Sequence, residues 1–150
     1  MILNQKQISA ILKLNITGKG GKDRQIAEAL GHYRVSSKYY DGVDPAGQAW
    51  EYKKQRAEQF LDPYKFSQMT AAEKEIPILF FNHVGGKVVS IHKATYKEVI
   101  DKMGYTEEGL SMLNELFERP EFANRMTQPK AAISSGEILS FDKIWERDKK

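Results

Sequence analysis

Polar residues in the segment "DGVDPAGQAWEYK", residues 41–53, could hold a divalent cation and act on a water molecule. Asp41 and Glu51 supply carboxylate oxygens, hard ligands that suit magnesium, and such a cation polarises a phosphoryl oxygen and helps to generate hydroxide. Lys53 follows Glu51 by two positions, so on a strand both side chains would leave the same face. Tyr52 would face the core and offer its backbone carbonyl as a further ligand. This arrangement predicts a metal-dependent site for phosphodiester hydrolysis.

The triplet also has a simpler interpretation. Glu51 and Lys53 could form an ordinary ion pair on an exposed strand face. Average composition produces a comparable triplet in about one chain in twenty, so the spacing alone leaves both interpretations open.

Composition limits the other kinds of chemistry. The chain has 150 residues, which predicts one domain over residues 1–150, and it has no cysteine, which excludes disulfides, thiolate metal sites and cysteine nucleophiles. A net charge of +3 and a pI of about 9.0 lean towards a polyanionic partner. The glycines of "GKGGK", residues 18–22, fit neither the phosphate-loop nor the dinucleotide fingerprint, so no nucleotide cofactor is expected.

Targeting signals are not recognisable in the sequence. No apolar run approaches the roughly 18 residues of a membrane span, and the first residues lack a long apolar core with a cleavage site. We therefore expect a cytoplasmic protein without membrane contact.

Hydrophobic periodicity predicts an alternation of helices and strands. Helices are expected over residues 4–14, 23–30 with Asp23 as the cap, 95–104 and 106–118. Strands are expected over residues 48–53, over a hairpin of residues 76–81 and 87–92 with a Gly-Gly turn, and as a short pair within residues 132–141. This pattern predicts the mixed α/β (α+β) class, with a central mixed, largely antiparallel β-sheet flanked by helices.

The segment "DGVDPAGQAWEYK" resembles the active-site segment of PvuII-like type II restriction endonucleases, which belong to the PD-(D/E)XK nuclease superfamily. Eight positions match without a gap: Asp41, Val43, Asp44, Ala46, Gly47, Gln48, Glu51 and Lys53. Three further segments are similar to a DNA-contacting loop, the central hairpin and a base-contacting segment of that family: "GGK" at 20–22, "IPILFFNHVGGKVVSIHK" at 76–93 and "QPK" at 128–130.

The resemblance implies a restriction-endonuclease-like fold and a site-specific hydrolase that uses Mg²⁺, with Mn²⁺ as a substitute, to cut double-stranded DNA. Asp41, Glu51 and the Tyr52 carbonyl would hold the metal, and Lys53 would position the attacking water. The catalytic core would span residues 32–95 and a DNA-contacting segment residues 125–141. A homodimer would read a palindromic site because the two-fold symmetries match. The implied biological setting is restriction–modification.

The resemblance also implies a set of DNA contacts outside the catalytic segment: Lys19, Lys22, Ser67, Gln68, His83, Thr127, Gln128 and Lys130. Phe66, Ser67 and Gln68 stand where the family has a histidine cluster, and Thr127 and Gln128 replace an asparagine pair. A glutamine can read adenine, so base readout is retained but the target sequence does not transfer.

Three alternatives stay open. Asp44 precedes Glu51 by seven residues, a spacing that resembles mismatch-repair nicking nucleases, so Asp44 is the alternative to Asp41 as metal ligand. The chain could also be a non-catalytic DNA-binding module, because "DRQIAEALG" resembles the first helix of a helix-turn-helix, although the following residues read as extended. The N-terminal helix could form the dimer contact or simply belong to the core.

Overall fold

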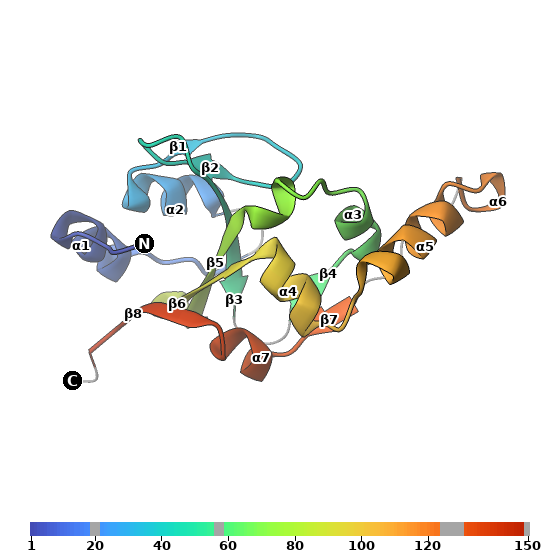
Figure 1. The fold of residues 1–150 in the computed structure, drawn as a ribbon. Coiled ribbons are helices and arrows are strands. Elements are labelled where there is room, and N and C mark those ends of the chain that lie inside the picture. Colours follow the sequence, from blue (N-terminus) through green and yellow to red (C-terminus); the bar gives the residue numbers. More distant parts are fainter. Residues whose placement is uncertain (19–21, 56–58, 124–130, 149–150) are drawn as a thin grey trace.

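The computed structural model describes residues 1–18, 22–55, 59–123 and 131–148 (Figure 1). Its main sheet has six strands in the order β1-β2-β3-β5-β6-β8, and β4 and β7 form a second sheet of two strands. The main-sheet strands are β1 (Tyr33–Arg34), β2 (Gly42–Val43), β3 (Ala49–Gln55), β5 (Pro77–Val84), β6 (Lys87–Thr95) and β8 (Asp142–Glu146). The small sheet joins β4 (Gln59–Leu61) to β7 (Ala131–Ile133).

Helices flank the main sheet. They are α1 (Gln5–Lys13), α2 (Asp23–Leu30), α3 (Pro63–Ser67), α4 (Tyr96–Lys102), α5 (Glu107–Phe117), α6 (Pro120–Ala123) and α7 (Ser135–Leu139), with a 3₁₀ turn η1 (Glu73–Glu75). Within the main sheet β3 and β5 run parallel, whereas the other described neighbours are antiparallel. The predicted class, α+β with a mixed, largely antiparallel sheet flanked by helices, is confirmed.

The two faces of the main sheet carry separate hydrophobic clusters. Alternation along β5 places Leu79 and Phe81 in one cluster and Ile78 and Phe80 in the other. The first cluster includes residues of α1 and α2, and the second includes residues of α3, α4, α5 and α7. Figure 1 shows α1 and α2 on one side of the sheet, with α5 and α6 extending away from it.

Strand β3 has the alternation that its sequence predicts. Trp50 and Tyr52 are buried in the cluster beneath α1 and α2, so Glu51 and Lys53 leave the opposite face. The hairpin of β5 and β6 is also confirmed, and its turn uses Gly85 and Gly86 with φ values of 58° and 85°.

Helix starts follow from local capping. Asn4, Thr95 and Ser134 each accept a backbone hydrogen bond at the start of α1, α4 and α7, with a reciprocal Gln or Glu three residues later. The predicted helices over 4–14, 95–104 and 106–118 thus exist, shortened by a residue or two at their ends.

Two sequence-based expectations were wrong. The tail does not fold back on itself as a strand pair: Ser135–Leu139 is helical, while β7 pairs with β4 and β8 pairs with β6. The capping box at Ser134 supplies the local reason for that helix. Asp23 does not cap α2, because Lys22 is the N-cap residue and no side chain caps this helix.

After α2 the chain enters β1, so the extended reading of this segment is confirmed and no second helix follows directly. Within the described part of the chain, no helix is long and apolar enough to cross a membrane.

Candidate metal and phosphodiester site

Asp41, Glu51 and Lys53 line one open cavity of about 400 Å³, beside the Tyr52 backbone. The other lining residues are mostly basic or acidic: Lys22, Asp23, Ser37, Lys38, Lys54, Gln59 and Lys65. The cavity is therefore a polar hollow in which carboxylates and ammonium groups face the same space. The structure thus brings together Asp41, Glu51 and Lys53, the triplet predicted from the sequence.

Asp41 is fixed at the edge of β3 by two backbone contacts. Its amide donates to the Trp50 carbonyl at 2.8 Å, and its carboxylate oxygen Oδ2 accepts from the Tyr52 amide at 2.9 Å. Because the amide and carbonyl of one strand residue point to the same edge, the Tyr52 carbonyl is directed towards this side as well. Asp41 and the Tyr52 carbonyl can thus offer oxygens to one ion.

Glu51 is 6% exposed, and its Oε2 accepts a hydrogen bond from the Tyr96 hydroxyl at 2.7 Å. Burial, together with a hydrogen bond to Asp41, raises the pKa of Glu51 to about 8. A carboxyl this deeply buried either keeps a proton or needs a compensating cation. This is the electrostatic condition in which a divalent ion displaces a proton.

The Tyr52 side chain packs against Gly42, the residue that follows Asp41. Its hydroxyl lies 2.7 Å from Nδ1 of the buried His32, and a Cβ added to Gly42 would stand 2.1 Å from the same hydroxyl oxygen. Only a glycine fits beside this ring, so the phenol packs directly on the backbone that follows Asp41. Gly42 and Tyr52 therefore set the position of the aspartate.

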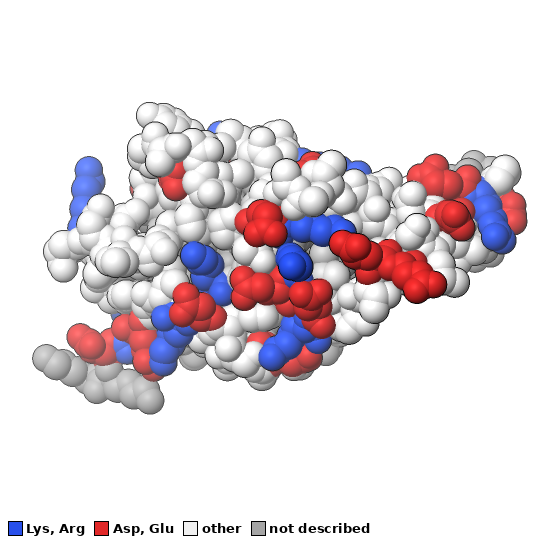
Figure 2. All heavy atoms as spheres, in the orientation of Figure 1, with Lys and Arg blue, Asp and Glu red and all other residues white. Residues whose placement is uncertain are grey.

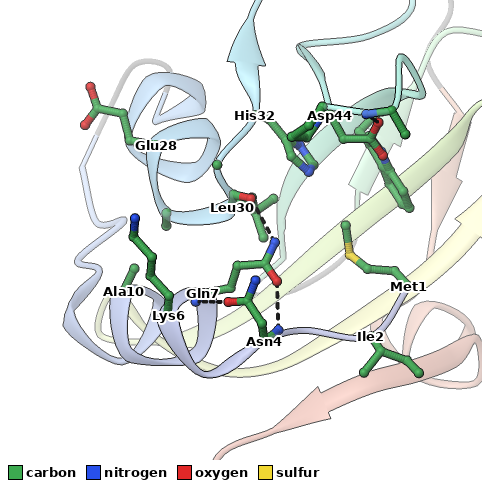
Figure 3. Close-up of a pocket in the computed structure, with 15 residues that line it drawn as sticks. Met1, Ile2, Asn4, Lys6, Gln7, Ala10, Glu28, Leu30, His32 and Asp44 are labelled. Carbon is green, nitrogen blue, oxygen red and sulfur yellow. Dashed lines mark hydrogen bonds between the residues drawn. The ribbon is translucent and has the colours of Figure 1, made fainter.

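Asp44 is engaged elsewhere. Its carboxylate accepts hydrogen bonds from the amides of Ala46 and Gln48 and from the Trp50 indole, at 2.9 to 3.0 Å. Burial opposes its ionisation, yet these hydrogen bonds leave the pKa of Asp44 below its ordinary value. The residue lines a different hollow, of about 620 Å³, between α1, α2 and the β2–β3 turn (Figure 3). Asp44 is thus a turn residue in this structure, separated from the cavity of Glu51.

Several residues of the cavity were not predicted from the sequence. Asp23, the first residue of α2, has a raised pKa because of burial and then the charge of Asp41, with which it also shares a hydrogen bond. Lys65 of α3 and Tyr96 at the start of α4 also reach this region. Asp23 was predicted only as a helix cap, and no sequence pattern indicated that Lys65 or Tyr96 lies near Glu51. Each of the three residues belongs to a different element from β3, so spacing along the chain does not relate it to the triplet.

The donor set fits a hard divalent cation. Mg²⁺ is commonly bound by one or two carboxylates, and water and substrate phosphate complete its shell. Asp41, Glu51 and the Tyr52 carbonyl supply such a set. Burial disfavours the negative charge of Glu51, and a bound cation would compensate that charge. Among the described residues, no three His, Cys, Asp or Glu side chains form a metal-binding group by themselves.

The residues expected to contact DNA have varied placements. Lys22 lines the cavity, and Gln68 is exposed and accepts from the Lys38 ammonium at 2.5 Å. The Ser67 hydroxyl donates to the Tyr64 carbonyl at 2.6 Å, and His83 is only 9% exposed at the hairpin. Four further residues fall outside the described part of the chain: Lys19, Thr127, Gln128 and Lys130.

The face in Figure 2 carries acidic and basic side chains intermixed over its lower middle and at its right end, and most of its upper left is uncharged. Among the described residues of this face, no continuous basic stripe of the kind that follows a nucleic-acid backbone is visible. Around the cavity of Glu51 the basic side chains are those of Lys22, Lys38, Lys53, Lys54 and Lys65.

No protein-family model matches the chain, and no curated protein sequence matches it.

Proposed function

We propose that this chain is a metal-dependent, site-specific endonuclease of double-stranded DNA, of the restriction type and with a restriction-endonuclease-like fold. The observation that carries the proposal is the convergence of Asp41, Glu51, Lys53 and the Tyr52 backbone on one cavity. The eight ungapped matches within residues 41–53 to PvuII-like enzymes support the same chemistry.

In this proposal some residues bind the metal and one residue acts on the attacking water. Asp41, Glu51 and the Tyr52 carbonyl would hold Mg²⁺ or Mn²⁺, which supplies polarisation of the phosphoryl oxygen and an acidified water. Lys53 leaves the same face of β3 as Glu51, and its ammonium forms no ion pair within the described part of the chain. It is available to orient the attacking water. Tyr96 holds Glu51, and Tyr52 holds Asp41, each by a hydrogen bond.

We further propose that the enzyme acts as a homodimer on a palindromic site in the cytoplasm. Ile11 of α1 is fully buried within the chain, which supports an intrachain packing role for this helix. Ile2 and Leu12 beside it are 95% and 43% exposed and would supply apolar surface for the second subunit.

The test is cleavage of supercoiled and linear duplex DNA of known sequence with Mg²⁺ or with EDTA. We expect discrete fragments that disappear with EDTA and in Glu51→Ala. Glu108→Ala is the matched control because this glutamate is exposed on α5, and it should cut as the wild type does.

Other outcomes have defined meanings. Binding of many duplexes without cutting in any divalent metal would replace the proposal with a non-catalytic DNA-binding module. Cutting of only one strand would move the assignment to a nicking nuclease of the mismatch-repair type.

A further inference from the structure

Four lysines line the cavity besides Lys53, and one of them, Lys65, is half-buried. Lys65 belongs to α3, a short helix that begins at Pro63 after the Asp62 cap. Its side chain lines the cavity together with Asp41, Glu51 and Lys53. Phe66, the next residue, is 2% exposed, so the helix that carries Lys65 is anchored in the core.

The ammonium of Lys65 is only partly satisfied. The side chain is half-buried, and within the described part of the chain it forms no ion pair or hydrogen bond. Its Nζ lies 5.5 Å from the centroid of the Tyr39 ring. Burial lowers the pKa of Lys65, and the charges of Glu51 and Asp41 oppose that effect. A desolvated cation without a hydrogen-bond acceptor is costly unless a ligand supplies one.

Lys38 approaches the same ring. Its Nζ lies 5.4 Å from the Tyr39 centroid and donates to Gln68. Tyr39 itself is held in place, because it is 6% exposed and its carbonyl accepts from the Tyr96 hydroxyl at 2.7 Å. Two lysines from separate segments are thus arranged around one fixed aromatic ring, at the rim of the cavity that holds Glu51.

We propose that Lys65 binds a non-bridging oxygen of the phosphate being cleaved, and that Lys38 binds a neighbouring phosphate of the same strand. This inference rests on the proposed nuclease function and extends it to two residues outside the catalytic triplet. Lys65 is the deeper of the two and faces Glu51 and Asp41, whereas Lys38 is exposed. The division of roles follows from this difference in depth.

The chemistry gives Lys65 a defined task. In the hydrolysis a water oxygen forms a bond to phosphorus, one ester bond from phosphorus to sugar oxygen breaks, and the water proton leaves to solvent or to the departing oxygen. As the water oxygen adds to phosphorus, negative charge grows on the non-bridging oxygens, and an ammonium carried to the cavity by the anchored helix α3 stabilises it more in the transition state than in the bound substrate. Lys65 and Lys53 then act on different atoms, the phosphate oxygen and the water.

The kinetic test compares Lys65→Met, Lys38→Met and Lys97→Met on one duplex substrate. Lys97 is exposed on α4 and lines another hollow, so it is the control and should leave kcat and KM unchanged. Lys65→Met should lower kcat about 100-fold with little change in KM. Lys38→Met should instead raise KM. When Ca²⁺ replaces Mg²⁺ and DNA binding is measured at several salt concentrations, the same variant should reduce the slope of log binding constant against log salt by about one unit.

A second measurement does not depend on cleavage. The lysines of the wild type are reductively ¹³C-methylated, which keeps their charge, and inorganic phosphate is titrated while their NMR signals are followed. Lys65 is assigned by the signal that disappears in Lys65→Arg, a variant that retains charge in case Lys65→Met does not fold. We expect saturable shifts for Lys65 and not for Lys97.

The outcomes separate the two proposals. If the wild type cuts DNA and Lys65→Met cuts equally fast, the role of Lys65 is wrong and the nuclease function stands. If the wild type cuts nothing but phosphate shifts the Lys65 signal, the phosphate site stands and the nuclease function is wrong. If phosphate shifts no lysine and no DNA is cut, both are wrong.

Discussion

The hydroxyl of Tyr96 lies 2.7 Å from a carboxylate oxygen of Glu51 and 2.7 Å from the carbonyl of Tyr39. One phenol thereby joins the start of α4, the middle of β3 and the segment before Asp41. A phenol has a single proton, so it can donate to only one of these acceptors at a time. When Glu51 is protonated it can donate to the phenol oxygen instead, and all three groups are satisfied.

Tyr96→Phe tests whether the Tyr96 hydroxyl positions the Glu51 carboxylate. The Tyr96 hydrogen bond favours the ionised form of Glu51, so its loss should raise the pKa of Glu51 further. We expect a lower kcat, an acidic limb of the pH–rate profile displaced to higher pH, and a stability loss of about 1–3 kcal/mol. Tyr105→Phe is the control, since Tyr105 packs on the same core cluster. An unshifted pH profile would reduce Tyr96 to a packing residue.

Stability without metal should depend on pH through Glu51. Its pKa is raised from the ordinary 4.5 to about 8 by burial and by Asp41, so the folded state retains a proton that the unfolded chain has lost. The stability contributed by this proton is fully present below pH 4.5 and is lost as the pH rises through about 8.

The measurement is Tm in EDTA across this pH range, for the wild type and Glu51→Gln. We expect the Tm of the wild type to fall relative to that of the variant as the pH rises. Mg²⁺ should raise the Tm of the wild type more at pH 8 than at pH 5, because metal and proton compete for the carboxylate. Parallel Tm curves for the two proteins would contradict the raised pKa.

Gly42→Ala should abolish activity by displacing the backbone segment that carries Asp41. The new Cβ would stand 2.1 Å from the Tyr52 hydroxyl oxygen and 2.9 Å from the ring, so either the phenol or the Asp41 segment must move. We expect a stability loss of about 1–3 kcal/mol in chemical denaturation and little remaining cleavage. Gly136→Ala is the matched control, because nothing lies within 4 Å of its added Cβ and it sits within α7. Equal behaviour of the two variants would show that the contact at Gly42 is not restrictive.

Exchanging each aspartate for asparagine distinguishes Asp41 from Asp44. Asp41→Asn should abolish Mg²⁺-dependent cleavage and keep the fold. Asp44→Asn should keep cleavage but lose about 1 kcal/mol of stability, because the Trp50 indole loses its charged acceptor. The reverse pattern, with cleavage lost in Asp44→Asn alone, would assign the metal to Asp44.

Gln68→Ala should relax sequence selectivity. The side chain is exposed, its carbonyl oxygen accepts from Lys38, and it also hydrogen-bonds the Tyr64 side chain, so one of its two amide hydrogens remains to donate to a base. We expect additional cleavage sites and a loss of discrimination of about 1–3 kcal/mol, measured on duplexes that differ at one base pair. Gln25→Ala on the exposed surface of α2 is the control, and an unchanged digest for Gln68→Ala would remove this residue from base readout.

The sequence by itself determined the longer helices, the central strands and one wall of the site. Capping residues fixed the starts of α1 and α4, and two glycines fixed the β5–β6 turn. Alternation along β3 placed Glu51 opposite Tyr52, because successive strand side chains point to opposite faces. These features depend on neighbours within a few residues, and spacing encodes them directly.

Only the tertiary structure decided which residues meet at the cavity. Tyr96 reaches Glu51 from 45 residues away, and α2 and α3 bring Asp23 and Lys65 to the same space. The choice between Asp41 and Asp44 as a neighbour of Glu51 also depended on how the β2–β3 turn folds, since both aspartates stand at plausible spacings. Such contacts arise when helices pack on the two faces of a sheet, and local periodicity contains no information about which distant side chains that packing brings together.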